Sequence, residues 1–134
     1  MEAAYIAVFD IGTTAIKGLL IDRHAKVFGE MSANVETISE SPGQVEQNPE
    51  GWWKGVASIA NYWWTTLKVP ANAIRCISFS GQMEDVIPVD HRSSQQPNAI
   101  LYSDHRAKRE AEMINARLPE ISSLTGNEVT ATTP

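Results

Sequence analysis

The sequence predicts an α/β fold with a mixed sheet, an N-terminal three-stranded meander and flanking helices. Three observations support this. Short apolar runs separated by polar turns open the chain, as is typical of strands. Residues 49–67 repeat large apolar side chains at helical spacing. A further apolar run, residues 74–79, leads into a glycine turn of the kind found at the carboxyl edge of α/β sheets.

The first element is expected to be a tight β-hairpin. Residues 6–9 are apolar and partly β-branched, which indicates a buried strand. Asp10 is predicted to end this strand, and Gly12 to permit a reversal that most residues would resist. Residues 16–21 then form the second strand. The hairpin tip would therefore present a carboxylate, two hydroxyls and backbone amides.

These groups suit the phosphates of a nucleotide. The turn amides and the hydroxyls of Thr13 and Thr14 can donate to phosphate oxygens. Lys17 can neutralise phosphate charge as a compact cation. Asp10 would repel a bare phosphate, so its expected role is to hold Mg²⁺. An ordinary hairpin turn is the alternative interpretation, and the Gly-Lys-Ser/Thr ending of a Walker loop is missing.

The middle of the chain predicts a third strand, a loop and a helix. Residues 27–35 form the strand after a polar turn, and residues 38–48 are expected to be a surface loop. Asn48 would cap a helix that Pro70 stops. One helical face carries Trp52, Val56, Ile59, Trp63 and Leu67, widened by Trp53, Ala57, Ala60 and Trp64. We expect the four tryptophans to serve packing rather than to form a ligand cage.

A second candidate site follows the fourth strand, residues 74–79. Gln82 and Glu84 could hydrogen-bond a polyol, and Met83 could line its carbon face. A solvated polar turn is the alternative. Farther on, Asp104 precedes a helix predicted for residues 105–118, so it is either a helix N-cap or a ligand contact.

The remaining segments have weaker signals. Residues 86–89 and 99–102 read as short strands, whereas residues 90–97 and 124–134 read as polar, loop-like segments.

Composition sets limits on function. The chain has 134 residues, the size of one domain, with 43% hydrophobic and 20% charged residues. Its net charge of −5 argues against nucleic-acid or anionic-membrane partners. A signal peptide and a membrane span are not expected, and the single cysteine, Cys76, fits a reducing cytoplasm. Cys76 is predicted to be buried and inert, and no structural zinc site is expected.

Together, the motifs resemble the start of the FGGY carbohydrate kinases. They are, in order, the Asp10-Ile-Gly-Thr-Thr hairpin, Gly43-Gln-Val-Glu-Gln-Asn-Pro before Trp52-Trp53, Ser80-Gly-Gln-Met, Leu101-Tyr-Ser-Asp-His-Arg and Thr125-Gly-Asn. Each motif alone is weak, but five in this order are specific, and the resemblance covers the whole chain.

The resemblance implies that residues 1–134 are part of the N-terminal lobe of a protein about four times longer, with two actin-like, ribonuclease-H-like lobes. It implies ATP and Mg²⁺ as cofactors, with Asp10 as the Mg-linked catalytic aspartate and Gly12, Thr13, Thr14 and Lys17 near the phosphates. Gln82, Met83, Glu84 and Asp104 would contact the sugar. The catalytic base and the second lobe would be absent, so the chain alone is expected to be inactive.

The sugar is expected to be a pentulose or a related polyol, with xylulose favoured. Glu84 and Asp85 stand where xylulose kinases usually have His-Gly, and a glutamate at position 84 resembles the glycerol kinase branch. Tyr102 stands where a tryptophan is common in the family. The expected partners are this sugar, the missing C-terminal lobe and, through apolar surface left exposed, a second copy of the chain. A non-catalytic actin-like scaffold and another actin-like ATPase are the alternative functions.

Overall fold

The computed structural model describes residues 4–89, 92 and 96–133. Contacts within the chain divide it into two compact units. The first unit comprises Met1–Glu36 and Glu50–Gln82, and the second comprises Thr37–Pro49 and Met83–Pro134.

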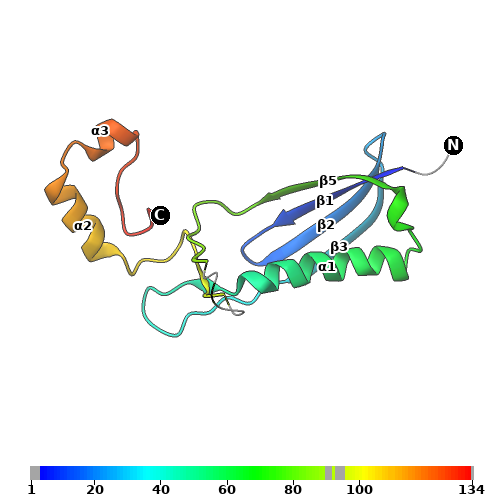
Figure 1. Cartoon of the computed structure of the whole chain (residues 1–134), viewed down its shortest axis with the longest axis horizontal. Coiled ribbons are helices and arrows are strands. Elements are labelled where there is room, and N and C mark those ends of the chain that lie inside the picture. The colour runs from blue at the N-terminus through cyan, green and yellow to red at the C-terminus, as the bar shows by residue number, and fades with distance from the viewer. Residues whose placement is uncertain (1–3, 90–91, 93–95, 134) are drawn as a thin grey trace. The chain divides into compact units, whose positions relative to one another are not determined.

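A four-stranded mixed sheet forms the first unit. β1 (Tyr5–Ile11), β2 (Ala15–Asp22) and β3 (Val27–Asn34) form an antiparallel meander, and β5 (Ile74–Gly81) joins β1 in parallel. The strand order is β3-β2-β1-β5 (Figure 1). The predicted meander, fourth strand and mixed sheet are therefore confirmed. β1 runs through Asp10 to Ile11, so the expectation that Asp10 ends the strand was wrong.

One helix covers one face of this sheet. α1 (Pro49–Thr65) runs along the strands (Figure 1) and buries Val56, Ile59 and Trp63 against them. The rings of Phe9 and Trp63 lie 5.3 Å apart, which joins β1 to α1 at the centre of the core. The buried core of the unit consists of Ala7, Phe9, Ile16, Leu20, Val56, Ile59, Trp63, Val69 and Ala73.

The prediction that the four tryptophans serve core and lobe packing is confirmed for two of them and stays a prediction for the other two. Trp63 is buried and Trp52 packs partly against the core, but Trp53 and Trp64 are 69% and 66% exposed. The helix is therefore amphipathic over a narrower stripe than predicted, and the face carrying Trp53 and Trp64 lies outside the core. The helix also ends at Thr65, before Pro70, which instead precedes the short 3-10 helix η1 (Ala71–Ala73).

The edge strand β5 is more open than expected. Its residues after Ile74 are exposed, including Ile77 and Phe79, each at 57%. Cys76 is exposed as well, so the prediction of a buried thiol was wrong. An apolar strand sequence is normally buried on both faces, but here no helix covers the outer part of β5 within the first unit.

The second unit is built on two short strands. β4 (Glu46–Gln47) pairs antiparallel with β6 (Ala99–Ile100). The predicted loop at residues 38–48 was thus partly wrong, because it contains β4, and Gln47 is fully buried. The predicted strand at residues 86–89 is reduced to one bridge, from Val86 to Ile100. Within the loop predicted for residues 90–97, residues 90, 91 and 93–95 lie outside the described part of the chain.

Two helices complete the second unit. α2 (Lys108–Arg117) begins later than predicted and has Ala107 at its N-cap position, without a side-chain cap. The N-cap interpretation of Asp104 was therefore wrong. α3 (Ile121–Thr125) overlaps the start of the segment predicted as a loop, residues 124–134. Within the described part of the chain, no helix has both the length and the apolar character needed to cross a membrane.

The close approach of α1 to the sheet predicts a steric limit at Gly18. A Cβ placed there would stand 2.5 Å from Ile59 Cγ2 and 3.1 Å from a ring carbon of Trp63. We expect Gly18→Ala to lower the unfolding free energy by about 1–3 kcal/mol, the usual cost of overpacking. Urea denaturation followed by circular dichroism measures this change.

Gly51→Ala is the matched control, because nothing lies within 4 Å of its added methyl group. Alanine at this helical position should raise the unfolding free energy by up to about 1 kcal/mol. Equal effects of the two substitutions would contradict the proposed packing.

Candidate functional site

The hairpin tip between β1 and β2 is closed by a backbone hydrogen bond. The Gly12 amide donates to the Ala15 carbonyl at 3.2 Å, so this amide is used inside the turn. Gly12 has no positive φ, contrary to the reason expected from the sequence. Instead, a Cβ at Gly12 would stand 2.9 Å from the Ala15 oxygen. Glycine is therefore required for space, and the phosphate-donor role of Thr13 and Thr14 stays a prediction.

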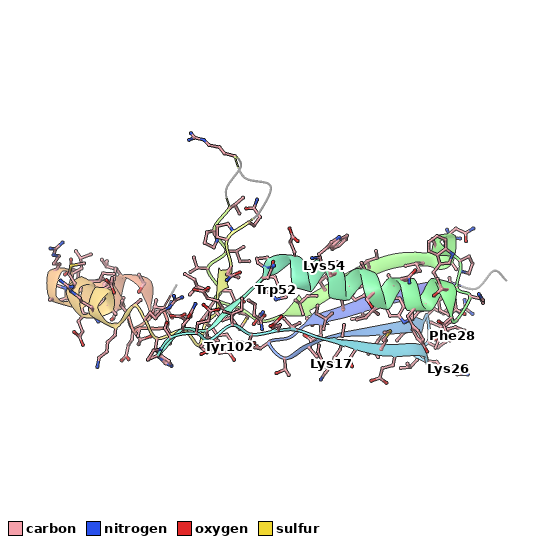
Figure 2. All side chains as sticks on the ribbon, turned by 90° about the horizontal axis from the view of Figure 1, so that it is seen from below. Lys17, Lys26, Phe28, Trp52, Lys54 and Tyr102 are labelled. Carbon is pink, nitrogen blue, oxygen red and sulfur yellow. The ribbon has the colours of Figure 1, made fainter. Side chains whose placement is uncertain are left out.

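A row of polar side chains crosses the sheet beside this tip. The register pairs Asp10 with Lys17, Lys17 with Ser32, and Asp10 with Ser80. The neighbouring residues Phe9 and Ile16 are buried on the α1 side, so alternation places the polar row on the opposite face. Figure 2 shows Lys17 on that side.

The Asp10 carboxylate is held by a neighbouring strand. Ser80 Oγ donates to Asp10 Oδ1 at 2.9 Å, and Asp10 itself is exposed. Lys17, its cross-strand partner, is exposed too. A carboxylate and an ammonium therefore stand side by side on an accessible face, and their roles toward a metal ion and a phosphate stay a prediction.

Gln82 reaches the same edge of the sheet as Asp10. Its backbone amide donates to the Ile11 carbonyl at 2.9 Å, which extends the parallel pairing of β1 and β5 by one residue. Gly81 permits this approach, because a Cβ there would stand 2.8 Å from the Ile11 oxygen. Asp10 and Gln82 thus lie where two parallel strands end, which is where open α/β sheets bind ligands.

The donor set is compatible with Mg²⁺ in one mode of binding. Among the described residues, no group of three or more His, Cys, Asp or Glu side chains could enclose a metal ion. Mg²⁺ is commonly held by one or two carboxylates together with substrate phosphates and water. The single exposed carboxylate of Asp10 fits that mode.

In the second unit, Glu84 lines a groove of about 600 Å³. Glu84 adopts a left-handed backbone conformation, with φ of 63°, which is uncommon for a residue other than glycine. Met83 beside it is 74% exposed. The other residues lining the groove are Ile114, Ile121, Thr125, Asn127, Glu128, Val129, Thr130, Thr132 and Thr133. Hydroxyl, amide and carboxylate groups beside apolar side chains suit a polyol.

Asp104 lies in the second unit and is only 5% exposed. Its carboxylate accepts hydrogen bonds from the Val45 amide at 2.8 Å and from Arg106 Nε at 2.9 Å. Burial raises the pKa of this carboxyl, but the hydrogen bonds from Arg106 and Val45 outweigh burial and hold the pKa below its ordinary value. These bonds thus favour the ionised form of Asp104 and already occupy its carboxylate.

Five residues that the sequence analysis did not select as site residues form hydrogen bonds beside Asp104 and Glu84. Glu46 accepts from Arg106 and Asn98, and Asp85 accepts from the Tyr102 amide. The sequence held one signal for the first pair: opposite charges stand in two separate motifs, Gly43–Pro49 and Leu101–Arg106. Asp85 offered none, because a carboxylate in a polar turn looks solvated.

Comparison with known proteins decides the family. The N-terminal domain of the FGGY family of carbohydrate kinases matches residues 5–134. The chain belongs to this family. Xylulose kinase of Bacillus subtilis (strain 168) is 35% identical over 102 residues, which are 76% of this chain and 20% of that protein.

Solved structures of family members have the same fold. A xyloylose kinase from Brucella ovis is 29% identical, with a TM-score of 0.85 over 96% of this chain and 27% of its own. Gluconate kinase from Lactobacillus acidophilus is 29% identical, with a TM-score of 0.84 over 98% of this chain and 26% of its own. The expected actin-like, ribonuclease-H-like α/β class is confirmed. The chain spans about a quarter or less of the length of these FGGY proteins.

The ion pairs that Asp104 and Glu46 each form with Arg106 predict that acid destabilises the second unit. The pKa of Glu46 is lowered, first by the hydrogen bond from Asn98, and the pKa of Asp104 is lowered as described above. A lowered folded-state pKa stabilises the protein above the unfolded-state value of about 4. This stability is lost as the pH falls through the folded-state pKa.

We therefore expect the unfolding free energy of the chain to fall between about pH 5 and pH 2, with a shallower fall in Asp104→Asn. Urea titrations at a series of pH values measure both curves. Burial raises the pKa of Asp85, so protonation of this carboxyl favours the folded state as the pH falls. Asp85→Asn removes this contribution and should therefore steepen the acid limb slightly. Identical acid limbs in the wild type and Asp104→Asn would exclude Asp104 as a source of acid sensitivity.

Proposed function

We propose that the chain is part of an ATP-dependent sugar kinase. The reaction would transfer the γ-phosphate of MgATP to a hydroxyl of a pentulose or related polyol, with a xylulose-like acceptor favoured. The observation that carries the proposal is the adjacent pair Asp10 and Lys17, exposed on the free sheet face beside a tight turn. Membership of the FGGY carbohydrate kinases supports the same reaction.

Each hairpin residue has a defined role in this proposal. Asp10 would hold Mg²⁺, oriented by the hydrogen bond from Ser80. When bound, Mg²⁺ offsets negative charge on the phosphate oxygens. Lys17 would attract the phosphates, and Thr13 and Thr14 would donate hydrogen bonds to them. Such positioning and charge stabilisation supply most of the catalysis in phosphoryl transfer.

The acceptor sugar would bind through the loop that follows β5. Gln82 and Glu84 would hydrogen-bond its hydroxyls, and Met83 would cover a carbon face. The groove beside Glu84, with its threonine, asparagine and glutamate side chains, supports a neutral polyhydroxyl ligand. Asp104 stays a predicted sugar contact, although its carboxylate is already occupied by protein donors.

The catalytic base and most of the adenosine site would come from a C-terminal lobe of the same polypeptide. The relatives' greater length supports this. A face of the first unit supports it too: a groove of about 430 Å³ between α1 and β5 is lined almost entirely by apolar side chains, including Trp53, Trp64, Ile77 and Phe79. We propose that later parts of the polypeptide cover this groove. A second copy of the chain is the alternative occupant.

The chain alone is therefore expected to be inactive. The resemblance to the FGGY kinases implies that the base accepting the proton of the attacking hydroxyl lies downstream of the motifs in this chain. Incubation with MgATP and D-xylulose, D-ribulose, glycerol or gluconate should release no ADP above the rate without sugar, as followed by a coupled assay. Sugar-dependent ADP release from the purified chain would overturn this part of the proposal.

Asp10 provides the direct test in a protein extended to the length of its relatives. Asp10→Ala should lower kcat by about 10²-fold or more, because charge stabilisation at the transferred phosphate is lost. The melting temperature should stay near that of the wild type, because Asp10 is exposed.

Glu30→Ala is the matched control, since Glu30 is an exposed acid on β3 and lies on the same sheet face. Its kcat should remain close to that of the wild type. An Asp10→Ala protein with normal kcat per folded molecule would refute the role assigned to Asp10.

A further inference from the structure

The segment Leu101–Arg106 of the second unit is fastened to Gly43–Gln47 by backbone and side-chain bonds. The Leu101 amide donates to the Val45 carbonyl at 3.0 Å, and the His105 amide donates to the Gly43 carbonyl at 2.8 Å. Asp104 accepts from the Val45 amide at 2.8 Å. These bonds join two segments that are more than 50 residues apart in the sequence.

An ion network strengthens the same junction. Arg106 donates through Nε to the Asp104 carboxylate, and its terminal nitrogen contacts Glu46. Glu46 also accepts from Asn98 Nδ2 at 3.1 Å. The side chains of Asp104 and Glu46 are 5% and 14% exposed, whereas that of Arg106 is 37% exposed, so water reaches this network from the Arg106 side. The planar guanidinium of Arg106 is suited to serve both carboxylates, which lysine would not match.

The other side of Leu101–Arg106 holds the loop that carries Glu84. The Tyr102 amide donates to Asp85 Oδ1 at 2.9 Å. Next to it, Val86 and Ile100 exchange two backbone hydrogen bonds, each of 2.9 Å. Figure 2 labels Tyr102, the residue at the centre of this junction. Glu84 is therefore followed directly by two anchored residues.

Glu84 needs such anchoring. A left-handed φ at a residue other than glycine costs free energy and persists only where the surroundings enforce it. We attribute this enforcement to the hydrogen bonds of the next two residues. Asp85 accepts from the Tyr102 amide, and Val86 pairs with Ile100. The network of Asp104, Arg106 and Glu46 fixes the segment that bears Tyr102.

We propose that Asp85, Asp104 and Arg106 are positioning residues that hold Glu84 in its left-handed conformation on the groove. This role is the alternative to the direct sugar contact predicted for Asp104, because Asp104 would act through Tyr102 and Asp85. The importance of Glu84 itself rests on the proposed sugar-binding function. The mechanical link from Asp104 to Glu84 does not, so the two ideas can be tested separately.

Proton–nitrogen NMR spectra of the 134-residue chain test the link without any sugar. The variants are Glu46→Gln, Arg106→Lys, Asp104→Asn and Asp85→Ala. We expect the Glu84 amide resonance to move along one line through all four, since each variant releases the same restraint to a different extent. Amide exchange at Tyr102 should rise about tenfold in Asp85→Ala, from which the acceptor is missing.

Two controls separate positioning from general destabilisation. Asp85→Asn keeps an acceptor oxygen and should restore slow Tyr102 exchange. Glu112→Ala removes an exposed carboxylate of α2 and should leave the Glu84 resonance unchanged. If Asp85→Ala does not fold, Glu46→Gln is the milder variant that still decides the question. A Glu84 resonance that stays fixed in folded Arg106→Lys and Glu46→Gln would overturn the proposal.

Titration of the same samples with D-xylulose addresses the function on which the role of Glu84 depends. If Asp104 acts by positioning, Arg106→Lys and Asp104→Asn should weaken binding by similar factors. Weaker binding in Asp104→Asn alone would assign Asp104 as a direct contact and overturn the positioning role. Absence of binding even in the wild type would count against the sugar site in this chain, while the resonance shifts would still decide the link.

Discussion

The packing of α1 on the sheet through Phe9 and Trp63 is the contact on which the first unit depends. It buries one face of all the meander strands in a single layer. Glycines at Gly18, Gly29 and Gly55 let the helix and sheet approach closely, because a Cβ at any of them would overlap a core side chain. With one face closed in this way, strand alternation leaves Asp10 and Lys17 on the other face. Core packing thereby sets the position of the polar site.

Most of the first unit was predictable because its signals are local. Apolar alternation and the turn at Gly12 identify the hairpin, and helical spacing identifies α1. What could not be predicted is which apolar residues the core would leave uncovered. Trp53, Trp64 and Cys76 carry patterns typical of buried residues, yet their burial depends on neighbours that sequence periodicity does not specify.

The second unit was harder to predict for a different reason. β4 and β6 have two residues each and are defined by pairing between distant segments, so neither has a periodic signal. Asp104 illustrates the problem. Its place before a helix made an N-cap a reasonable interpretation, but its carboxylate instead serves Val45, 59 residues away. A local pattern cannot show such a partner.

The carboxylates of Asp10 and Asp104 differ in their surroundings. Asp10 is exposed and has one hydroxyl donor, so it retains lone pairs for a ligand. Asp104 is enclosed and saturated by charged and backbone donors. The contrast matters because both are acids within recognisable motifs. Solvent access and remaining acceptor capacity, rather than residue type, separate a ligand-binding acid from a structural one.

The open edge of β5 has a consequence for biosynthesis. Within the described residues, β5 is an edge strand without lysine or proline, and it carries exposed Ile77 and Phe79, which is the kind of template that recruits other strands. In a polypeptide as long as its FGGY relatives, ribosomes would need on the order of tens of seconds to make the remainder. Over such an interval an uncovered edge strand favours association with other chains.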